Sequence, residues 1–233
     1  MGTDPIFMPM SGTVAELWRY PVKSMLGERR DELEVSARGA AGDRLYAVRD
    51  AEGKLGSGKN SRRHRRIEGL FGFSAVYEGE VPTITFPDGR RLLASDAGVH
   101  AALSAALRMP VRLAREAETP HFDSDPLHLV TTGSLARLGA DERRFRPNLV
   151  IDTDDDEASW TGRTLRVGEV SLRIVDRTGR CVMITMAQSE LGDEPGLLRA
   201  ISQGGGEPLF GVYAEVLVPG RIRRGDGVSL IGG

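Results

Sequence analysis

The sequence has one cysteine, Cys181, in 233 residues, and this scarcity excludes several kinds of site. One cysteine cannot form an intramolecular disulfide, so the chain is not a cysteine-stapled secreted module. Zinc sites made mainly of cysteine need more ligands of this type. An iron–sulfur cluster is excluded within the chain, because it takes roughly four cysteines, or two cysteines with two histidines.

Long apolar runs and an excess of charge of either sign are also missing. No segment has about 18 consecutive apolar residues, so we expect no transmembrane helix and no membrane partner. The balance of 31 basic and 33 acidic residues gives no reason to expect nucleic acid as a partner. Residues 1–10 lack the pattern of a signal peptide. We expect them to be a tag remnant or a disordered start, and the protein to be cytoplasmic.

Glycine and proline are plentiful instead, with 29 and 12 residues. The many turns they imply favour short strands, so we predict a mostly β fold with short helices. Strands are predicted at residues 14–20, 44–49, 71–77, 83–86, 91–94, 127–131, 148–152, 164–167, 170–175, 181–186, 209–218 and 228–231. A helix is predicted at residues 97–107, and a second is expected to be capped by Ser134 and to end near Gly139.

A loop with two prolines at residues 116–126 predicts the boundary between two domains. The first would cover residues 11–115 and the second residues 116–233. Closing each set of strands into a barrel would remove exposed sheet edges. The acidic run at residues 152–157 lacks the glycine and terminal glutamate of a calcium loop, so we interpret it as a solvated loop.

Three short segments could carry chemistry. Arg180 and Cys181 place a thiol beside cations that lower a thiol pKa, although a lone cysteine is often only a small buried hydrophobe. Lys23 and Ser24 follow a strand and could bind an anion, or simply form a solvated turn. Arg146 precedes a proline, which predicts an extended backbone; it could bind an anion, or pair with a surface carboxylate.

The histidines give weaker signals. His64 lies in the basic run at residues 62–66, which predicts a solvated stretch, or a surface that attracts an acidic redox partner. His121 and His128 are seven residues apart, a spacing that is not typical of metal ligands.

Taken in order, these segments resemble the MOSC family, in the branch with an N-terminal MOSC β-barrel domain that includes the mitochondrial amidoxime-reducing component and bacterial relatives. The resemblance covers nearly the whole chain after residue 10. The matching stretches are YPVKS (20–24), GDRLYAV (42–48), DPLHLVTTGSL (125–135), FRPNLVI (145–151), RCVMIT (180–185), PLFGVYAEV (208–216) and PGRIRRGDGV (219–228).

The resemblance implies a β-barrel MOSC domain after an N-terminal β-barrel-like domain, and a molybdenum cofactor, Mo-molybdopterin. It implies that Cys181 is the catalytic molybdenum ligand. The cofactor-binding residues it implies are Lys23, Ser24, Arg44, Thr131, Thr132, Ser134, Arg146, Asn148, Arg180 and Tyr213. This agrees with the need of an anionic cofactor for fixed cations and hydroxyl donors, and of molybdenum for soft sulfur.

The function implied is that of an oxidoreductase that reduces small N-hydroxylated compounds such as hydroxylamines and amidoximes. No flavin, haem or cluster motif is recognisable, so a separate electron-donor protein of the ferredoxin, flavin or haem type is expected. The alternative is a non-redox module that binds molybdopterin or carries sulfur as a persulfide on Cys181.

Overall fold

The computed structural model describes residues 11–202 and 205–231, and the described chain is mostly β. This confirms the predicted fold class. The expectation for residues 1–10 lies outside the described residues. Within those ranges, no helix is long and apolar enough to cross a membrane.

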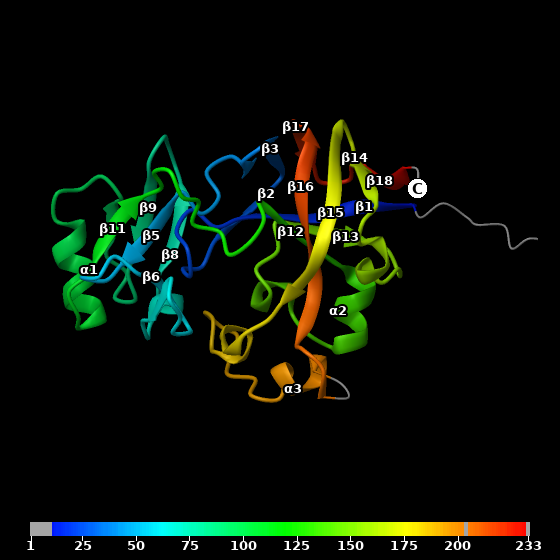
Figure 1. The fold of residues 1–233 in the computed structure, drawn as a ribbon. Coiled ribbons are helices and arrows are strands. Elements are labelled where there is room, and N and C mark those ends of the chain that lie inside the picture. The colour runs from blue at the N-terminus through cyan, green and yellow to red at the C-terminus, as the bar shows by residue number, and fades with distance from the viewer. Residues whose placement is uncertain (1–10, 203–204, 232–233) are drawn as a thin grey trace, which may run out of the picture.

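A closed β-barrel forms the larger half of the molecule (Figure 1). Its seven strands, counted in the described residues, follow one another around the ring, and β2 (Glu28–Arg30) extends the sheet beside the first of them. In ring order they are β1 (Ser11–Arg19), β13 (Leu149–Asp152), β12 (Leu127–Thr131), β16 (Leu209–Val218), β15 (Val170–Gly179), β14 (Thr164–Val167) and β18 (Gly227–Ile231).

The ring closes through β1, which pairs antiparallel with both β13 and β18. A closed ring with an odd number of strands cannot be antiparallel throughout, so it must contain at least one parallel pair. Here that pair is β12–β13. Parallel neighbours need a crossover connection, which here contains α2 (Thr132–Leu138). The first strand of the described chain is therefore part of the barrel formed by the C-terminal strands.

Alternation along the strands separates two hydrophobic cores. Leu127 and Leu129 of β12 point into the barrel, where they pack with Trp160. Val130, the residue after Leu129, belongs to a second core that includes residues of α2 and α3 (Leu197–Ile201). Successive strand residues face opposite sides of a sheet, so β12 is buried on both faces.

The N-terminal part forms two small sheets with α1 (Val99–Leu107) on their outer side, at the left of Figure 1. Phe73, Ile84 and Leu103 are fully buried in their shared core. The sheets have the order β10–β9–β8 and β11–β5–β6–β7. Their strands are β5 (Tyr46–Arg49), β6 (Leu55–Ser57), β7 (His64–Arg66), β8 (Ser74–Tyr77), β9 (Pro82–Thr85), β10 (Arg91–Leu93) and β11 (Arg112–Arg115).

A third small sheet joins an early and a late segment of the chain. In it, β17 (Gly220–Arg223) pairs with β3 (Glu32–Ser36), and β3 pairs with β4 (Gly39–Ala40). The domain division at residues 115/116 stays a prediction. The structure adds that β1 and β3, from before that boundary, pair with strands from after it.

Two local predictions were wrong. The N-cap of α2 is Thr131, whose side chain accepts the backbone N–H of Ser134, and Ser134 lies inside the helix; the end near Gly139 is confirmed. Residues 181–186 are not a strand but contain the 3₁₀ helix η4 (Val182–Thr185). Arg144 explains this, because its guanidinium donates hydrogen bonds to the carbonyls of Ile184 and Met186. A β-strand would need these carbonyls for hydrogen bonds to a neighbouring strand. The other 3₁₀ helices are η1 (Leu70–Gly72), η2 (Glu142–Arg144) and η3 (Glu157–Trp160).

Candidate functional site

A cavity of about 110 Å³ lies where the barrel meets the N-terminal sheets, and Cys181 is in its wall. Strand β15 ends at Gly179, and the half-buried Cys181, two residues later, is the N-cap of η4. The predicted residues that share this lining are Lys23, Ser24, Arg44, Arg146, Arg180, Cys181 and Tyr213. The structure therefore brings together residues from both sides of the predicted domain boundary.

The turn after β1 fixes Lys23 and Ser24. Pro21 ends the strand, and the backbone then runs beside β5, with Lys23 N–H donating to the Tyr46 carbonyl at 2.8 Å. Ser24 is buried and donates its hydroxyl to the Gly56 carbonyl at 3.0 Å. Both side chains are held by the fold, which excludes the solvated turn considered from the sequence.

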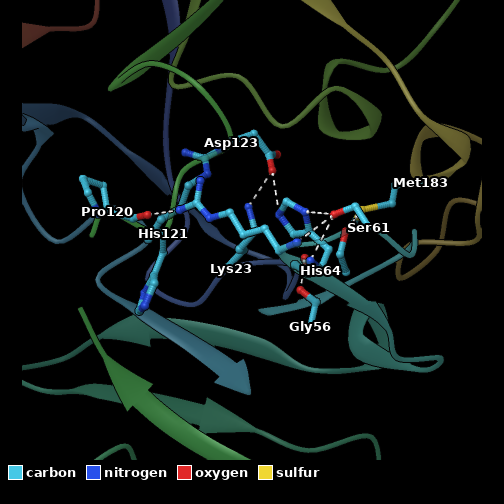
Figure 2. A network of polar contacts seen from close by, with 12 residues as sticks. Lys23, Gly56, Ser61, His64, Pro120, His121, Asp123 and Met183 are labelled. Carbon is cyan, nitrogen blue, oxygen red and sulfur yellow. Dashed lines mark hydrogen bonds and ion pairs between the residues drawn. The ribbon is translucent and has the colours of Figure 1, made fainter. Parts of the chain in front are cut away.

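Asp123 joins Lys23 to His64 at the edge of this cavity (Figure 2). Its Oδ1 lies 2.9 Å from Lys23 Nζ and 3.2 Å from His64 Nε2. Partial burial raises the pKa of Asp123, but the contacts with His64 and Lys23 hold it well below its usual range. Burial also lowers the pKa of Lys23. The prediction of a solvated His64 was wrong, because β7 buries it.

Arg146 has the least satisfied charge of the site. Its guanidinium stacks on the Tyr20 ring, with Cζ 4.2 Å from the ring centroid. Among the described residues, neither Nη1 nor Nη2 has a hydrogen-bond partner, although both are buried. Burial lowers the pKa of Arg146 to about 10. A buried cation without an acceptor is costly, so this side chain is suited to an anionic ligand.

Arg180 and Arg44, in contrast, are held firmly. Arg180 donates to the carbonyls of Phe210 at 2.8 Å and Phe145 at 3.0 Å, and its Nη2 contacts His128 Nε2. Arg44 pairs with the fully buried Asp43. Burial lowers the pKa of Arg180 to about 10. These contacts give both cations a fixed position beside the cavity.

Backbone strain is concentrated at this site. Ser24, Arg44 and Arg146 have φ values of 64°, 51° and 56°, in the left-handed region that residues other than glycine rarely adopt. The expectation of an extended Arg146 was therefore wrong. Its N–H donates to the Glu142 and Arg143 carbonyls at the end of η2, which sets this conformation. Strained residues tend to gather at functional sites.

Sequence reasoning missed two residues that hold the site. Arg144 is buried, and it donates to the carbonyls of Ile184, Met186 and Gly192, so it fixes the segment that follows Cys181. Burial, and then the neighbouring Arg180, hold the pKa of His128 well below its ordinary value. A neutral His128 can accept from Arg180. Arg144 directly precedes the FRPN motif and His128 begins the HLV stretch. Their position at these motifs was the signal in the sequence that could have identified them.

Four predicted residues do not line this cavity. Thr131 and Ser134 donate their hydroxyls to the buried carboxylate of Glu157, and Thr132 donates to Asp152. The acidic run is thus not simply a solvated loop. Asn148 is fully buried and bridges the Trp18 carbonyl and the His128 N–H. All four act here within the barrel wall and α2, and a direct cofactor role for them stays a prediction.

The cavity has the chemistry of an anion site with one soft ligand. Within the described ranges, its lining includes six basic side chains and one carboxylate, Asp123. In that same part of the chain, no group of three or more His, Cys, Asp or Glu residues could hold a metal ion. A metal at Cys181 would thus need most of its ligands from a cofactor. The unpartnered Arg146 and the Cys181 thiol fit an anionic, metal-carrying cofactor.

Comparison with known proteins agrees with this organisation. The MOSC domain model matches residues 117–229, and the MOSC N-terminal beta barrel domain model matches residues 11–102. The chain is 27% identical to mitochondrial amidoxime-reducing component 1 of Mus musculus and 26% identical to that of Homo sapiens, over 95% of this chain and 83% of each relative. The crystal structure of the YuaD protein from Bacillus subtilis has the same fold, with a TM-score of 0.52, 14% identity, and coverage of 96% of this chain and 97% of that one.

Proposed function

The chain belongs to the MOSC family, with the N-terminal β-barrel domain before the MOSC domain, and on this premise we propose that it is a molybdenum-cofactor oxidoreductase that reduces N-hydroxylated compounds. The observation that carries the proposal is the Cys181 thiol in a cavity with six basic side chains, counted among the described residues. The amidoxime-reducing name of its relatives supports the substrate class.

Each residue of the cavity has a distinct part in this proposal. Arg146 supplies unpaired donors for an anionic group of the cofactor, and Lys23 and Arg180 add charge from positions that the fold fixes. Cys181 supplies the thiolate ligand. When bound, the cofactor supplies the two-electron redox chemistry, which no side chain of the site can perform. The protein contributes binding, orientation and the surrounding positive charge.

Electrons would come from a separate protein in this proposal. Cys181 is the only cysteine in the sequence, so the chain cannot form a dithiol or a cluster of its own. We therefore propose an external donor of the ferredoxin, flavin or haem type. A free thiolate also requires a reducing environment, and we propose the cytoplasm as the location.

The proposal is tested by cofactor loading in a host that makes the molybdenum cofactor. The wild type should retain molybdenum and pterin, and reduce an amidoxime when a reduced viologen dye supplies electrons. Cys181→Ser should keep the pterin and lose the reduction, because the metal loses its protein ligand. The neighbouring Val182→Thr, at an exposed position, serves as the matched control and should behave like the wild type.

Two results would contradict the reductase proposal. One is a wild type that is fully loaded with molybdenum yet reduces no N-hydroxylated compound. The other is a transferable persulfide on Cys181 that disappears in Cys181→Ser, which would favour the sulfur-carrier alternative.

A further inference from the structure

A second cavity, of about 240 Å³, adjoins the first and has a different character. The two share Ser24, Ser57 and Met183 in their linings, so they are direct neighbours. The apolar residues that line the second cavity, which we call the apolar cleft, are Ile67, Leu70, Phe71, Met183, Met186 and Ala187. The basic cavity at Cys181 thus lies directly beside an apolar one.

The polar groups of the apolar cleft are already engaged. Ser24 donates its hydroxyl to the Gly56 carbonyl at 3.0 Å, and Ser57 Oγ contacts Met183 Sδ at 3.5 Å. Arg66 and Glu68, at the exposed rim, pair with each other at 3.1 Å. Among the described residues, none of the buried side-chain polar atoms without a partner belongs to this lining. A polar ligand would lose its hydrogen bonds to water here without replacement.

The part of the cleft lining that follows Cys181 in the chain is adaptable. Met183 and Met186 lie on the segment that begins with η4, and methionine side chains fit irregular apolar ligands because they are unbranched and polarisable. Gly58 lets Met183 approach closely, since a Cβ at that position would lie 2.3 Å from Met183 Cγ. On the far side, Ile67, Leu70 and Phe71 belong to the buried N-terminal core and form a fixed wall.

The size of the apolar cleft indicates its occupant. An apolar protein cavity of about 150 Å³ binds benzene, so about 240 Å³ admits one ring with a substituent. The cofactor is anionic and rich in hydrogen-bonding groups, and these match the basic cavity rather than the cleft. The remaining molecule that must reach Cys181 is the substrate.

We propose that the apolar cleft binds the hydrophobic, ring-sized part of the substrate while its N-hydroxylated group lies at Cys181. The preferred substrates are then aromatic amidoximes and hydroxylamines rather than small polar ones. Met186 and Ala187 are specificity-determining residues of this cleft, while the residues of the basic cavity serve every substrate. This inference rests on the proposed function for its account of turnover, but the binding of the ring can be measured without turnover.

The experiment compares two amidoximes that share the reacting group and differ in the substituent, phenyl or methyl. Apolar pockets commonly discriminate by about 10-fold or more, so the molybdenum-loaded wild type should have a kcat/KM at least about tenfold higher for the phenyl compound. Met186→Gln retains the side-chain length and adds an amide. It should lower this ratio about tenfold, mainly through the KM of the phenyl compound.

Ala187→Trp is the second variant, because its position is exposed and a larger side chain can enter the cleft without opening the core. It should weaken the phenyl compound selectively too. Leu217→Gln, at an exposed position on β16, is the control for Met186→Gln because it also replaces an apolar side chain with glutamine. It should leave the phenyl-to-methyl ratio of kcat/KM unchanged. Thermal melting of each variant checks that it is folded.

Binding to the oxidised, loaded protein without an electron donor provides the readout that is independent of turnover. Calorimetry should give tighter binding for the phenyl than for the methyl compound, and Met186→Gln and Ala187→Trp should remove the difference. Equal affinities in the wild type, or equal losses for both compounds in the variants, would overturn the inference. Selective phenyl binding with no reduction would support the cleft and contradict the reductase proposal instead.

Discussion

The sharpest prediction concerns Arg146, whose charge is buried without an acceptor. Replacing it with methionine keeps a long flexible side chain and removes the charge. We expect Arg146→Met to stabilise the cofactor-free protein and to abolish retention of the cofactor. If a substitution raises the stability of the cofactor-free protein and abolishes cofactor retention, the original residue serves binding at a cost in stability.

The expected size follows from the contacts of Arg146. Burial lowers its pKa from 12.5 to about 10, which at about 1.4 kcal/mol per pKa unit disfavours the charged form by about 3.5 kcal/mol. Stacking on Tyr20, at 4.2 Å, returns about 0.5–2 kcal/mol. The substitution loses both effects, so we expect a gain of about 1.5–3 kcal/mol in the free energy of unfolding.

Arg44→Met is the matched control, because it removes a guanidinium of the same cavity that is paired. It leaves the fully buried Asp43 carboxylate without its cation, and should cost about 3–5 kcal/mol. Urea unfolding at pH 7 measures both variants, and metal analysis of loaded samples measures retention. If both substitutions destabilise the protein to a similar extent, the reasoning about an unpaired Arg146 is refuted.

Two further predictions concern acid stability and access to the thiol. His121 is fully buried and its pKa is lowered to about 4, first by burial and then by Arg49; the unfolded chain therefore binds more protons below about pH 6.5. The unfolding free energy should therefore fall by about 1–2 kcal/mol between pH 7 and pH 5. Urea titrations of His121→Gln should show an unfolding free energy that depends less on pH. The same pH dependence in the variant and the wild type would contradict a role for His121. Arg144→Met should free the segment at residues 184–192 and increase the rate of Cys181 alkylation several-fold, and an unchanged rate would mean that Arg144 does not position it.

Much of the site could be predicted because its residues occur in compact motifs. Lys23 with Ser24, and Arg180 with Cys181, are adjacent in the sequence, and each pair follows the end of a strand. Their charges and the single thiol indicated an anion and a metal before any geometry was known. The mostly β fold followed from the turns that glycine and proline imply.

Membership of a motif does not reveal which way a side chain points, and here sequence reasoning reached its limit. Thr131 and Ser134 lie in a stretch that matched the family, yet both hydroxyls turn to Glu157 because α2 starts there. The sign of φ at Arg146, and the carbonyls that Arg144 takes from η4, depend on contacts between distant segments. Local propensity carries no information about such contacts.

The position of β1 in the barrel has a consequence for how the protein is made. Its two neighbours in the ring, β13 and β18, end at Asp152 and Ile231, and the short strand β2 pairs only with its last three residues, Leu17–Arg19. A ribosome that has just released β1 must add well over a hundred further residues before the first of these ring partners exists, and nearly the whole chain before the second. Contacts so distant in sequence slow folding, and an unpaired strand is prone to aggregation. Biosynthesis therefore leaves most of β1 without its ring partners during the longest part of synthesis, and a chaperone that shields its edge should raise the yield of folded protein.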